Sequence, residues 1–391
     1  MLNFDLDKNC YGCGACSEVC PGNAISMKQN NEGFLIPFIA GALCINCGLC
    51  EKTCPNLNPV ESEYPLSEGQ CFAAFVKDED ERMKSASGAV FPALAKAVLN
   101  DGGLVCGCVW NETMEAVHIL TDNNEDIDKM RGSKYVQSRT EDCYTRIKAA
   151  LNEEKKVLFS GTPCQVGGLL SFTGRHDNLY TVAVICAGVE SPKVWNKYVT
   201  YLEQKEHDSL TDAKFRAKGR LGWRTPSISY SFKSGKVAEK PVYSFDEYMS
   251  GAHIYVRNSC TNCNYKNNGH VSDLIIGDFW GAPEELIEKS RNKGISAIIV
   301  NTQKGGSLFN RCSESFYVKS VSLEDITRRN PLLLKSAKVS EKRVAFFNNI
   351  DRISVQKNIR AAIGNRYAKR CVMWLLYNSG LLNRLKELLG K

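Results

Sequence analysis

From residue 71 onward, the chain alternates between stretches with helical spacing of apolar residues and short runs that are typical of buried strands. Leu94, Ala95 and Val98 give one such stretch an apolar face, and Asn100 to Gly103 supply turn residues that end it. The pattern predicts helices over residues 91–99, 144–151 and 192–204, and strands over residues 104–110, 157–160, 180–185, 274–276 and 297–300.

Residues 213–245 show a different pattern, in which Ile228, Tyr230 and Phe232 alternate with polar residues. A period of two is expected for antiparallel strands with one buried face. Taken with the alternation of helices and strands elsewhere, it predicts an α/β fold with a mixed sheet.

The first 56 residues carry the same cysteine pattern twice, offset by 34 positions. Each copy has three cysteines separated by two residues, a fourth three residues later, and then a proline. This spacing is typical of bacterial ferredoxins with two 4Fe-4S clusters, in which the fourth cysteine of each copy binds the other cluster. We therefore predict one cluster on Cys10, Cys13, Cys16 and Cys54, and a second on Cys44, Cys47, Cys50 and Cys20.

Zinc also takes four cysteines, but structural zinc sites usually pair two CxxC knuckles rather than three evenly spaced cysteines and a Cys-Pro. The 18 cysteines would suggest disulfides in a small secreted chain, whereas this chain has 391 residues. Its first five residues show no charged-then-apolar signal pattern, and no run approaches 18 apolar residues. We therefore expect a cytoplasmic protein with reduced thiols.

Two segments outside the predicted domains differ in composition. Residues 57–70 contain two prolines, three glutamates and no apolar period, so we expect a linker. The net charge of +7 is concentrated in residues 335–391, where thirteen Lys and Arg face three acidic residues. This basic tail also has apolar residues at helical spacing, among them Trp374. Packing on the body or on a second copy, and contact with an anionic membrane, are both compatible with that pattern. No nucleic-acid-binding motif is present, so we expect no nucleic-acid partner.

Several catalytic motifs are absent from the sequence. There is no G-x-G-x-x-G after a strand, no phosphate loop, no H-E-x-x-H and no G-x-S-x-G. The five histidines are scattered, and no two have the spacing of metal ligands. The sequence therefore identifies no catalytic residue and no proton donor.

Four further cysteines lie where another iron–sulfur site would need them: Cys164, Cys186, Cys260 and Cys263. The first follows a predicted strand and the pair Thr162-Pro163, which suits an N-cap and a first helical residue. Cys186 ends another strand, and neighbouring strand ends and helix N-termini can bring thiolates and N–H groups together. Two buried cysteines and an unpaired knuckle are the alternative.

Five blocks of sequence together are similar to the family of coenzyme F(420) hydrogenase/dehydrogenase beta subunits. They are residues 85–88, 131–138, 158–165, 259–263 and 272–281. The resemblance covers roughly residues 70–309, and the ferredoxin-type unit resembles the fusion found in some members. The family also contains the 7-hydroxymethyl chlorophyll a reductase, so its members do not all use the deazaflavin F(420).

The resemblance implies FAD in the α/β domain and a third 4Fe-4S cluster on the four further cysteines. The FAD contacts it implies are Ser87, Gly88, Ser133, Lys134, Tyr135, Gln137, Gly161 and Thr162. Gly88 at a helix start suits a pyrophosphate, and Lys134 can neutralise a phosphate. An ordinary N-cap serine at position 87 and a solvated loop lysine at position 134 are the alternatives. Asp278 and Trp280 either flank the flavin or belong to the core.

The predicted organisation is α/β overall, in four parts. A two-cluster α+β ferredoxin-like domain covers residues 1–56, a linker 57–70, a flavin and iron–sulfur domain 71–334, and a basic helical tail 335–391. Two departures from the family pattern stand in the flavin domain. The position after Cys186, commonly His, is Ala187, and a second glycine after Gly88 is replaced by Ala89.

These features predict an oxidoreductase that exchanges a hydride between F(420) and FAD and passes single electrons through 4Fe-4S clusters to a redox partner protein. The alternatives are a ferredoxin-fed flavin reductase of an organic substrate, as in the chlorophyll-reductase branch, and an electron-transfer protein without catalysis. A homo-oligomer and peripheral membrane contact through the tail are further expectations. The substrate and the direction of electron flow are left open.

Overall fold

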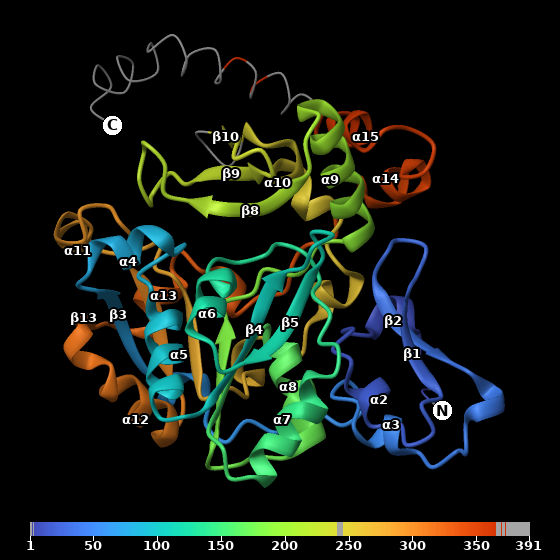
Figure 1. Ribbon diagram of the computed structural model, residues 1–391, viewed down its shortest axis with the longest axis horizontal. Coiled ribbons are helices and arrows are strands. Elements are labelled where there is room, and N and C mark those ends of the chain that lie inside the picture. Colours follow the sequence, from blue (N-terminus) through green and yellow to red (C-terminus); the bar gives the residue numbers. More distant parts are fainter. Residues whose placement is uncertain (1, 3, 241–244, 365–368, 370–371, 373–391) are drawn as a thin grey trace.

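The computed structural model describes residues 2, 4–240, 245–364, 369 and 372. Within them, an α/β body contains an eight-stranded mixed sheet, and an upper layer holds a three-stranded antiparallel sheet. A cysteine-rich unit, residues 4–58, lies beside helices α7 (Cys143–Asn152) and α8 (Pro163–Thr173) of the body (Figure 1). The predicted α/β class with a mixed sheet is confirmed.

The cysteine-rich unit repeats its backbone as well as its sequence. Its elements are α1 (Leu6–Asn9), α2 (Ala15–Glu18), β1 (Ile25–Gln29), β2 (Leu35–Ile39), a 3-10 turn η1 (Gly41–Leu43) and α3 (Leu49–Lys52). Helices α2 and α3 each begin after a left-handed glycine, Gly14 with φ 84° and Gly48 with φ 74°. A side chain is strained in that conformation, so the two glycines fix the same turn before each helix.

The large sheet has the strand order β13-β3-β12-β11-β7-β6-β4-β5. In that order the strands are Phe316–Ser320, Gln70–Val76, Ser296–Val300, Leu274–Asp278, Leu179–Val184, Val157–Gly161, Leu104–Trp110 and Ala116–Thr121. The four central strands β11, β7, β6 and β4 are parallel, and the remaining pairs are antiparallel. Strands β3, β5 and β13 were not among the predicted elements, whereas the other five lie where the pattern placed them.

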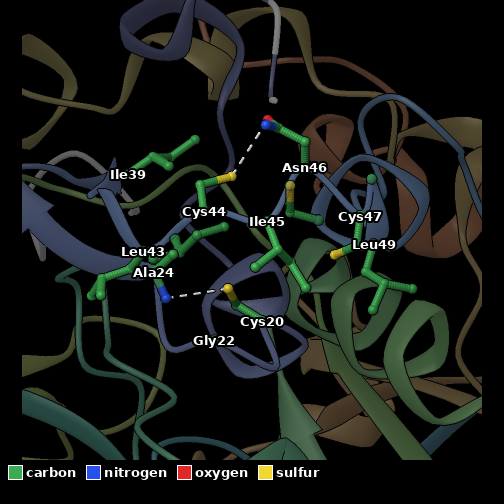
Figure 2. Close-up of a pocket in the computed structure, with 13 residues that line it drawn as sticks. Cys20, Gly22, Ala24, Ile39, Leu43, Cys44, Ile45, Asn46, Cys47 and Leu49 are labelled. Carbon is green, nitrogen blue, oxygen red and sulfur yellow. Dashed lines mark hydrogen bonds between the residues drawn. The ribbon is translucent and has the colours of Figure 1, made fainter. Parts of the chain in front are cut away.

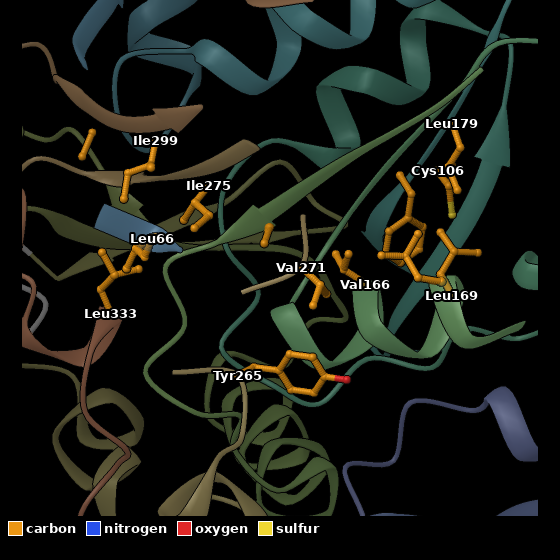
Figure 3. Packing of buried hydrophobic residues seen from close by; sticks show 14 of the residues in the cluster. Leu66, Cys106, Val166, Leu169, Leu179, Tyr265, Val271, Ile275, Ile299 and Leu333 are labelled. Atoms are coloured by element: carbon orange, nitrogen blue, oxygen red, sulfur yellow. The ribbon is translucent and has the colours of Figure 1, made fainter. Parts of the chain in front are cut away.

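Helices cover both faces of this sheet, which explains its continuous apolar strands. One core contains residues of α5 (Val90–Asn100), α6 (Asn124–Met130) and α12 (Gln303–Arg311), and α4 (Glu79–Lys84) lies near β3. The opposite core, shown in Figure 3, contains residues of α7, α8, α11 (Glu284–Lys289) and α13 (Leu323–Thr327). Ile275 of β11 belongs to the second core, whereas its neighbours Leu274 and Ile276 belong to the first.

The upper layer has a core of its own. It is built from α9 (Pro192–Glu206), β8 (Leu210–Ala217), β9 (Ser227–Phe232), β10 (Val237–Lys240), α10 (Glu247–Gly251), η4 (Ala252–Ile254), α14 (Arg343–Asn349) and α15 (Val355–Ile363). The antiparallel strands predicted over residues 213–245 are confirmed as β8, β9 and β10. Helices α14 and α15 belong to the predicted tail and pack on this layer through Phe346 and Ile359, while Trp374 lies outside the described residues.

The predicted linker is partly anchored. Leu66 in the 3-10 turn η2 (Leu66–Glu68) is 2% exposed and belongs to the second core of the body. Further 3-10 turns are η5 (Asn258–Asn262), η6 (Asn267–Gly269), η7 (Ser313–Ser315) and η8 (Pro331–Leu333). Across the described ranges, none of the helices has the length and apolar character needed to cross a membrane.

A buried arginine joins the cysteine-rich unit to the body. Arg257 is 2% exposed, and its guanidinium donates hydrogen bonds to the carbonyls of Cys10 at 2.6 Å and Leu35 at 3.0 Å. Its own backbone N–H donates to the carbonyl of Val189 at 2.9 Å. Gln137 adds a second connection, because its Oε1 accepts from the N–H of Leu35 at 2.9 Å. Charged hydrogen bonds of this kind are strong when water is excluded.

We expect Arg257→Ala to loosen the cysteine-rich unit without unfolding the body, because the two carbonyls lose their buried donor. Anaerobic limited proteolysis should cut the segment around residues 57–65 at least about tenfold faster than in the unchanged protein. Arg146→Ala, at a half-exposed arginine on α7, is the matched control. Equal cleavage rates for both variants would contradict this role.

Candidate functional site

Two cavities in the cysteine-rich unit are each lined by four cysteines, and the grouping is the predicted one. The inner cysteine set is Cys10, Cys13, Cys16 and Cys54. The outer cysteine set, shown in part in Figure 2, is Cys20, Cys44, Cys47 and Cys50. In both sets the fourth cysteine comes from the other copy of the repeat. The structure brings each set together, and iron ligation by these residues stays a prediction.

The donors around these cavities suit 4Fe-4S clusters. In the part of the chain that the structure describes, no three Cys, His, Asp or Glu side chains form a group that could hold a metal ion. A cubane takes one thiolate at each of four iron corners, so it suits cysteines arranged around a space. Backbone N–H groups also reach sulfur, from Gly12 to Cys10 Sγ at 3.2 Å and from Ala24 to Cys20 Sγ at 3.3 Å. Such donors stabilise bound thiolates.

The two sets differ in their access to solvent. Cys10, Cys13 and Cys16 of the inner set are buried, whereas Cys47 of the outer set is exposed. Ile45, which lines the outer cavity in Figure 2, is 69% exposed. A one-electron centre in the outer set would therefore lie at the protein surface.

The four cysteines of the body also approach one another. The body cysteine set is Cys164, Cys186, Cys260 and Cys263. Burial, followed by the nearby thiols of Cys263 and Cys186, raises the pKa of Cys164 to about 12. Burial likewise raises the pKa of Cys260, with Cys186 and Cys164 as its next causes. Thiols that influence each other in this way lie close together, and such buried thiols ionise only beside a strong positive centre, which iron supplies.

Local structure explains how Cys164 is presented. Helix α8 begins with Thr162 as N-cap and Pro163 as first residue, as the sequence predicts. The N–H of Thr162 donates to Gln165 Oε1 at 3.0 Å, and Thr162 Oγ1 lies 3.2 Å from Cys164 Sγ. The positive end of the helix dipole therefore favours negative charge on this sulfur.

The body set and the inner set meet across helix α8. A Cβ added to Gly168 would lie 2.9 Å from Cys13 Sγ, so only glycine allows this approach. Beside it, the rings of Tyr11 and Tyr265 pack edge to face with centroids 5.6 Å apart, and both residues are buried. The two sets are thus separated by packed side chains without an open gap.

A large cavity, the strand-end cavity, lies at the carboxyl ends of the parallel strands β6, β7 and β11. It encloses about 1670 Å³ of empty space, open solvent included, and Gly161, Val184 and Gly277 line it. Ligands of open α/β sheets bind at this edge of the sheet. Cys186, which follows β7, also lines the cavity, so the body cysteine set borders it.

Most of the residues implied to hold FAD surround this cavity. Six of the eight line it: Ser87, Ser133, Lys134, Tyr135, Gly161 and Thr162. The side chain of Gln137 instead faces the cysteine-rich unit, where it bonds Leu35 and Gly12. The N–H of Gly88 donates to Ser296 Oγ at 3.0 Å, and α5 begins one residue later, after Ala89.

Other features of the lining also suit FAD. Helix α5 has no side-chain cap, and its first turn, including Val90 and Phe91, lines the cavity. Uncapped N–H groups at a helix N-terminus suit a phosphate. Lys134 Nζ donates to the carbonyls of Lys129 at 2.7 Å and Arg131 at 3.2 Å, so it also holds its own loop closed. These donors and the cavity size are compatible with a dinucleotide.

Sequence reasoning missed several residues of the lining. His118 is buried against Ser160, with its Nε2 3.1 Å from that carbonyl, and burial lowers its pKa to about 4. It is therefore neutral near pH 7. Arg216 of β8 lies over the ring of Trp280, 4.2 Å from the ring centroid. Only the alternation of β8 could have signalled Arg216, since its contacts come from another layer.

These cysteine sets and the cavity define an iron–sulfur protein with a ligand site at the carboxyl edge of its sheet. Residues 9–57 match the 4Fe-4S dicluster domain. Residues 154–326 belong to the family described by the C terminus of the beta subunit of coenzyme F(420) hydrogenase/dehydrogenase. The predicted family resemblance and the predicted dicluster domain are both confirmed.

Two relatives are similar over most of the chain. The F component of the F(420)H(2) dehydrogenase of Methanosarcina mazei is 25% identical over 316 residues, which are 77% of this chain and 81% of that protein. The coenzyme F(420)-dependent sulfite reductase of Methanocaldococcus jannaschii is 24% identical over 361 residues, 88% of this chain. The chain spans about half of the sulfite reductase, 52%. The family and these relatives support an iron–sulfur oxidoreductase.

Among solved structures, a chain of the F(420)-reducing NiFe hydrogenase complex from Methanosarcina barkeri aligns with a TM-score of 0.46. The two sequences are 19% identical, and the alignment covers 76% of this chain and 93% of that chain.

Replacing both Cys260 and Cys263 by Ser tests the body cysteine set. We expect about four of about twelve irons to be lost, because one cubane loses two ligands. Iron and acid-labile sulfide on anaerobically purified protein give the measurement. Cys312→Ser, at a buried cysteine outside the three sets, should keep all the iron. Equal iron in the two variants would rule out a cluster at the body set.

Proposed function

We propose that the chain is an FAD- and iron–sulfur-dependent oxidoreductase. It exchanges a hydride with a deazaflavin-type carrier such as F(420) and passes single electrons to a redox partner protein. One observation carries this proposal: the strand-end cavity, the body set, the inner set and the exposed outer set follow one another from the interior to the surface. Such a series suits conversion between two-electron and one-electron chemistry.

When bound, FAD would accept a hydride and release electrons singly, and each cluster would carry one electron. The chain supports this with Cys186, which borders the strand-end cavity and belongs to the body set. Gly168 keeps the body and inner sets in contact, and the buried pair of Tyr11 and Tyr265 excludes water there. Exclusion of water protects reduced centres from side reactions.

The partner protein would dock at the outer set. Leu43, Ile45 and Leu49 line that cavity and are 56%, 69% and 38% exposed. An exposed apolar patch of this kind is common at protein contact sites. The predicted cytoplasmic location, the homo-oligomer and the membrane contact of the tail remain predictions beside this one.

The direct test is to add reduced F(420) to anaerobically purified protein and to follow flavin and cluster absorbance. Rapid bleaching of both is expected, because hydride transfer in the cavity would supply electrons to all three sets. If dithionite or reduced ferredoxin bleaches the protein but reduced F(420) does not, the ferredoxin-fed reduction of an organic substrate replaces this proposal.

Lys134→Ala tests the flavin site. It removes a positive charge at the cavity and the bonds that close the loop of residues 129–134, so flavin content should fall several-fold. Lys129→Ala removes an equal charge from the same loop at a side chain paired with Asp126, and flavin content should change little. Full FAD occupancy in Lys134→Ala would place the flavin elsewhere.

A further inference from the structure

A second chamber adjoins the strand-end cavity, between the β8–β10 sheet and the loops next to α4 and α6 below it (Figure 1). It encloses about 1660 Å³ of empty space, open solvent included. Six residues line both spaces: Ser85, Ala86, Arg131, Gly132, Ser133 and Arg216. A ligand in the strand-end cavity can therefore extend into the second chamber.

The roof of the second chamber is the polar face of an antiparallel sheet. Phe215 of β8 and Tyr230 of β9 belong to the core of the upper layer, whereas Lys214 and Ser229 line the chamber. Side chains alternate between the two faces of a sheet, and the polar face ordinarily meets bulk water. Here that face is turned toward the body and covers a cavity, so the roof suits a polar ligand.

The chamber is rich in positive charge. Six basic side chains line it: Lys84, Lys129, Arg131, Lys214, Arg216 and Lys218. Three acidic residues also line it, Asp128, Asp212 and Glu239. Asp128 is paired with Arg131, with 2.6 Å between Oδ1 and Nε. The nearest acid to Lys214 is Asp212, at a long 3.9 Å. An anion would offset the remaining positive charge.

The most buried of these bases points to the same ligand. Lys218 Nζ donates to the backbone carbonyls of Arg82 and, at 2.6 Å, Ser87. These acceptors are neutral, so the hydrogen bonds satisfy its donors without balancing its charge. Burial, with a smaller effect from Arg82, lowers the pKa of Lys218 to about 7. A bound anion nearby would favour the charged form.

The wall between the two spaces offers a flat surface. Trp280 lines the strand-end cavity and stacks on Trp223 with ring centroids 5.3 Å apart and an interplanar angle of 2°. Arg216 lies over Trp280 and also reaches Asp278 at 3.5 Å. Aromatic and guanidinium planes favour planar rings. The combination suits a ligand with a planar ring at one end and acidic groups at the other.

We propose that the second chamber binds the acidic side chain of the hydride carrier, while its planar ring lies in the strand-end cavity near Trp280. This inference rests on the proposed function, because it assumes that the carrier enters that cavity. F(420) has the required chemistry, since its deazaflavin ring bears a side chain with a phosphodiester and carboxylates. The same deazaflavin with only a neutral ribityl side chain lacks the acidic groups.

Binding of both compounds to the FAD-loaded, cluster-loaded protein tests the proposal, with deazaflavin fluorescence as readout. Lys214→Glu should weaken F(420) binding about tenfold at low salt and leave the shortened compound unaffected. Glu239→Gln removes a negative charge from the chamber and should tighten F(420) binding a few-fold. Lys233→Glu makes the same charge reversal at an exposed residue outside the chamber lining and should change neither affinity.

The outcomes separate the inference from the function on which it rests. If the unchanged protein oxidises reduced F(420) but Lys214→Glu and Glu239→Gln bind it as before, the chamber proposal alone is wrong. If Lys214→Glu loses FAD while keeping its F(420) affinity, the chamber belongs to the cofactor phosphates and the proposal also fails. If the unchanged protein neither binds nor oxidises F(420), both proposals fail together.

Discussion

The buried guanidinium of Arg257 is the interaction on which the arrangement of the candidate sites depends. It donates to the carbonyls of Cys10 and Leu35 in the cysteine-rich unit, while its backbone follows the bridge between Glu190 and Val256. That bridge lies between the loop of Cys186 and the turn of Cys260. One charged side chain thus holds together the segments that carry the inner and body cysteine sets. A buried charge is costly unless it is hydrogen-bonded, so this arrangement is specific as well as stabilising.

The close contact between the sets depends on small residues in helix α8. An added Cβ at Gly167 would overlap the ring of Tyr265, and one at Gly168 would meet Cys13. Glycine lowers helix stability, so two glycines in succession carry a local cost. The compensation is tertiary: the cysteine-rich unit packs directly on the helix that presents Cys164. Electron transfer between the sets benefits from the same packing, because it shortens the path through protein.

Much of this could be predicted from the sequence, and the part that could not has a clear physical reason. The spacing of the cysteines predicted their grouping, since ligand spacing within a short loop is a local property. Thr162 and Pro163 marked the start of α8 for the same reason. Strands β3, β5 and β13 were missed. Gly88 and Gln137 face other partners than the cavity, because their hydrogen bonds to Ser296 and Leu35 come from distant segments.

The second chamber shows the same limit in its strongest form. The alternation in residues 213–245 predicts a polar face and an apolar face, but not which neighbour the polar face meets. That depends on how the upper layer packs against the body, where Lys218 reaches the carbonyl of Ser87 and Arg216 reaches Asp278. A polar sheet face that would usually be solvated instead covers a space next to the strand-end cavity. Charge that would be screened by bulk water is therefore concentrated where a ligand passes.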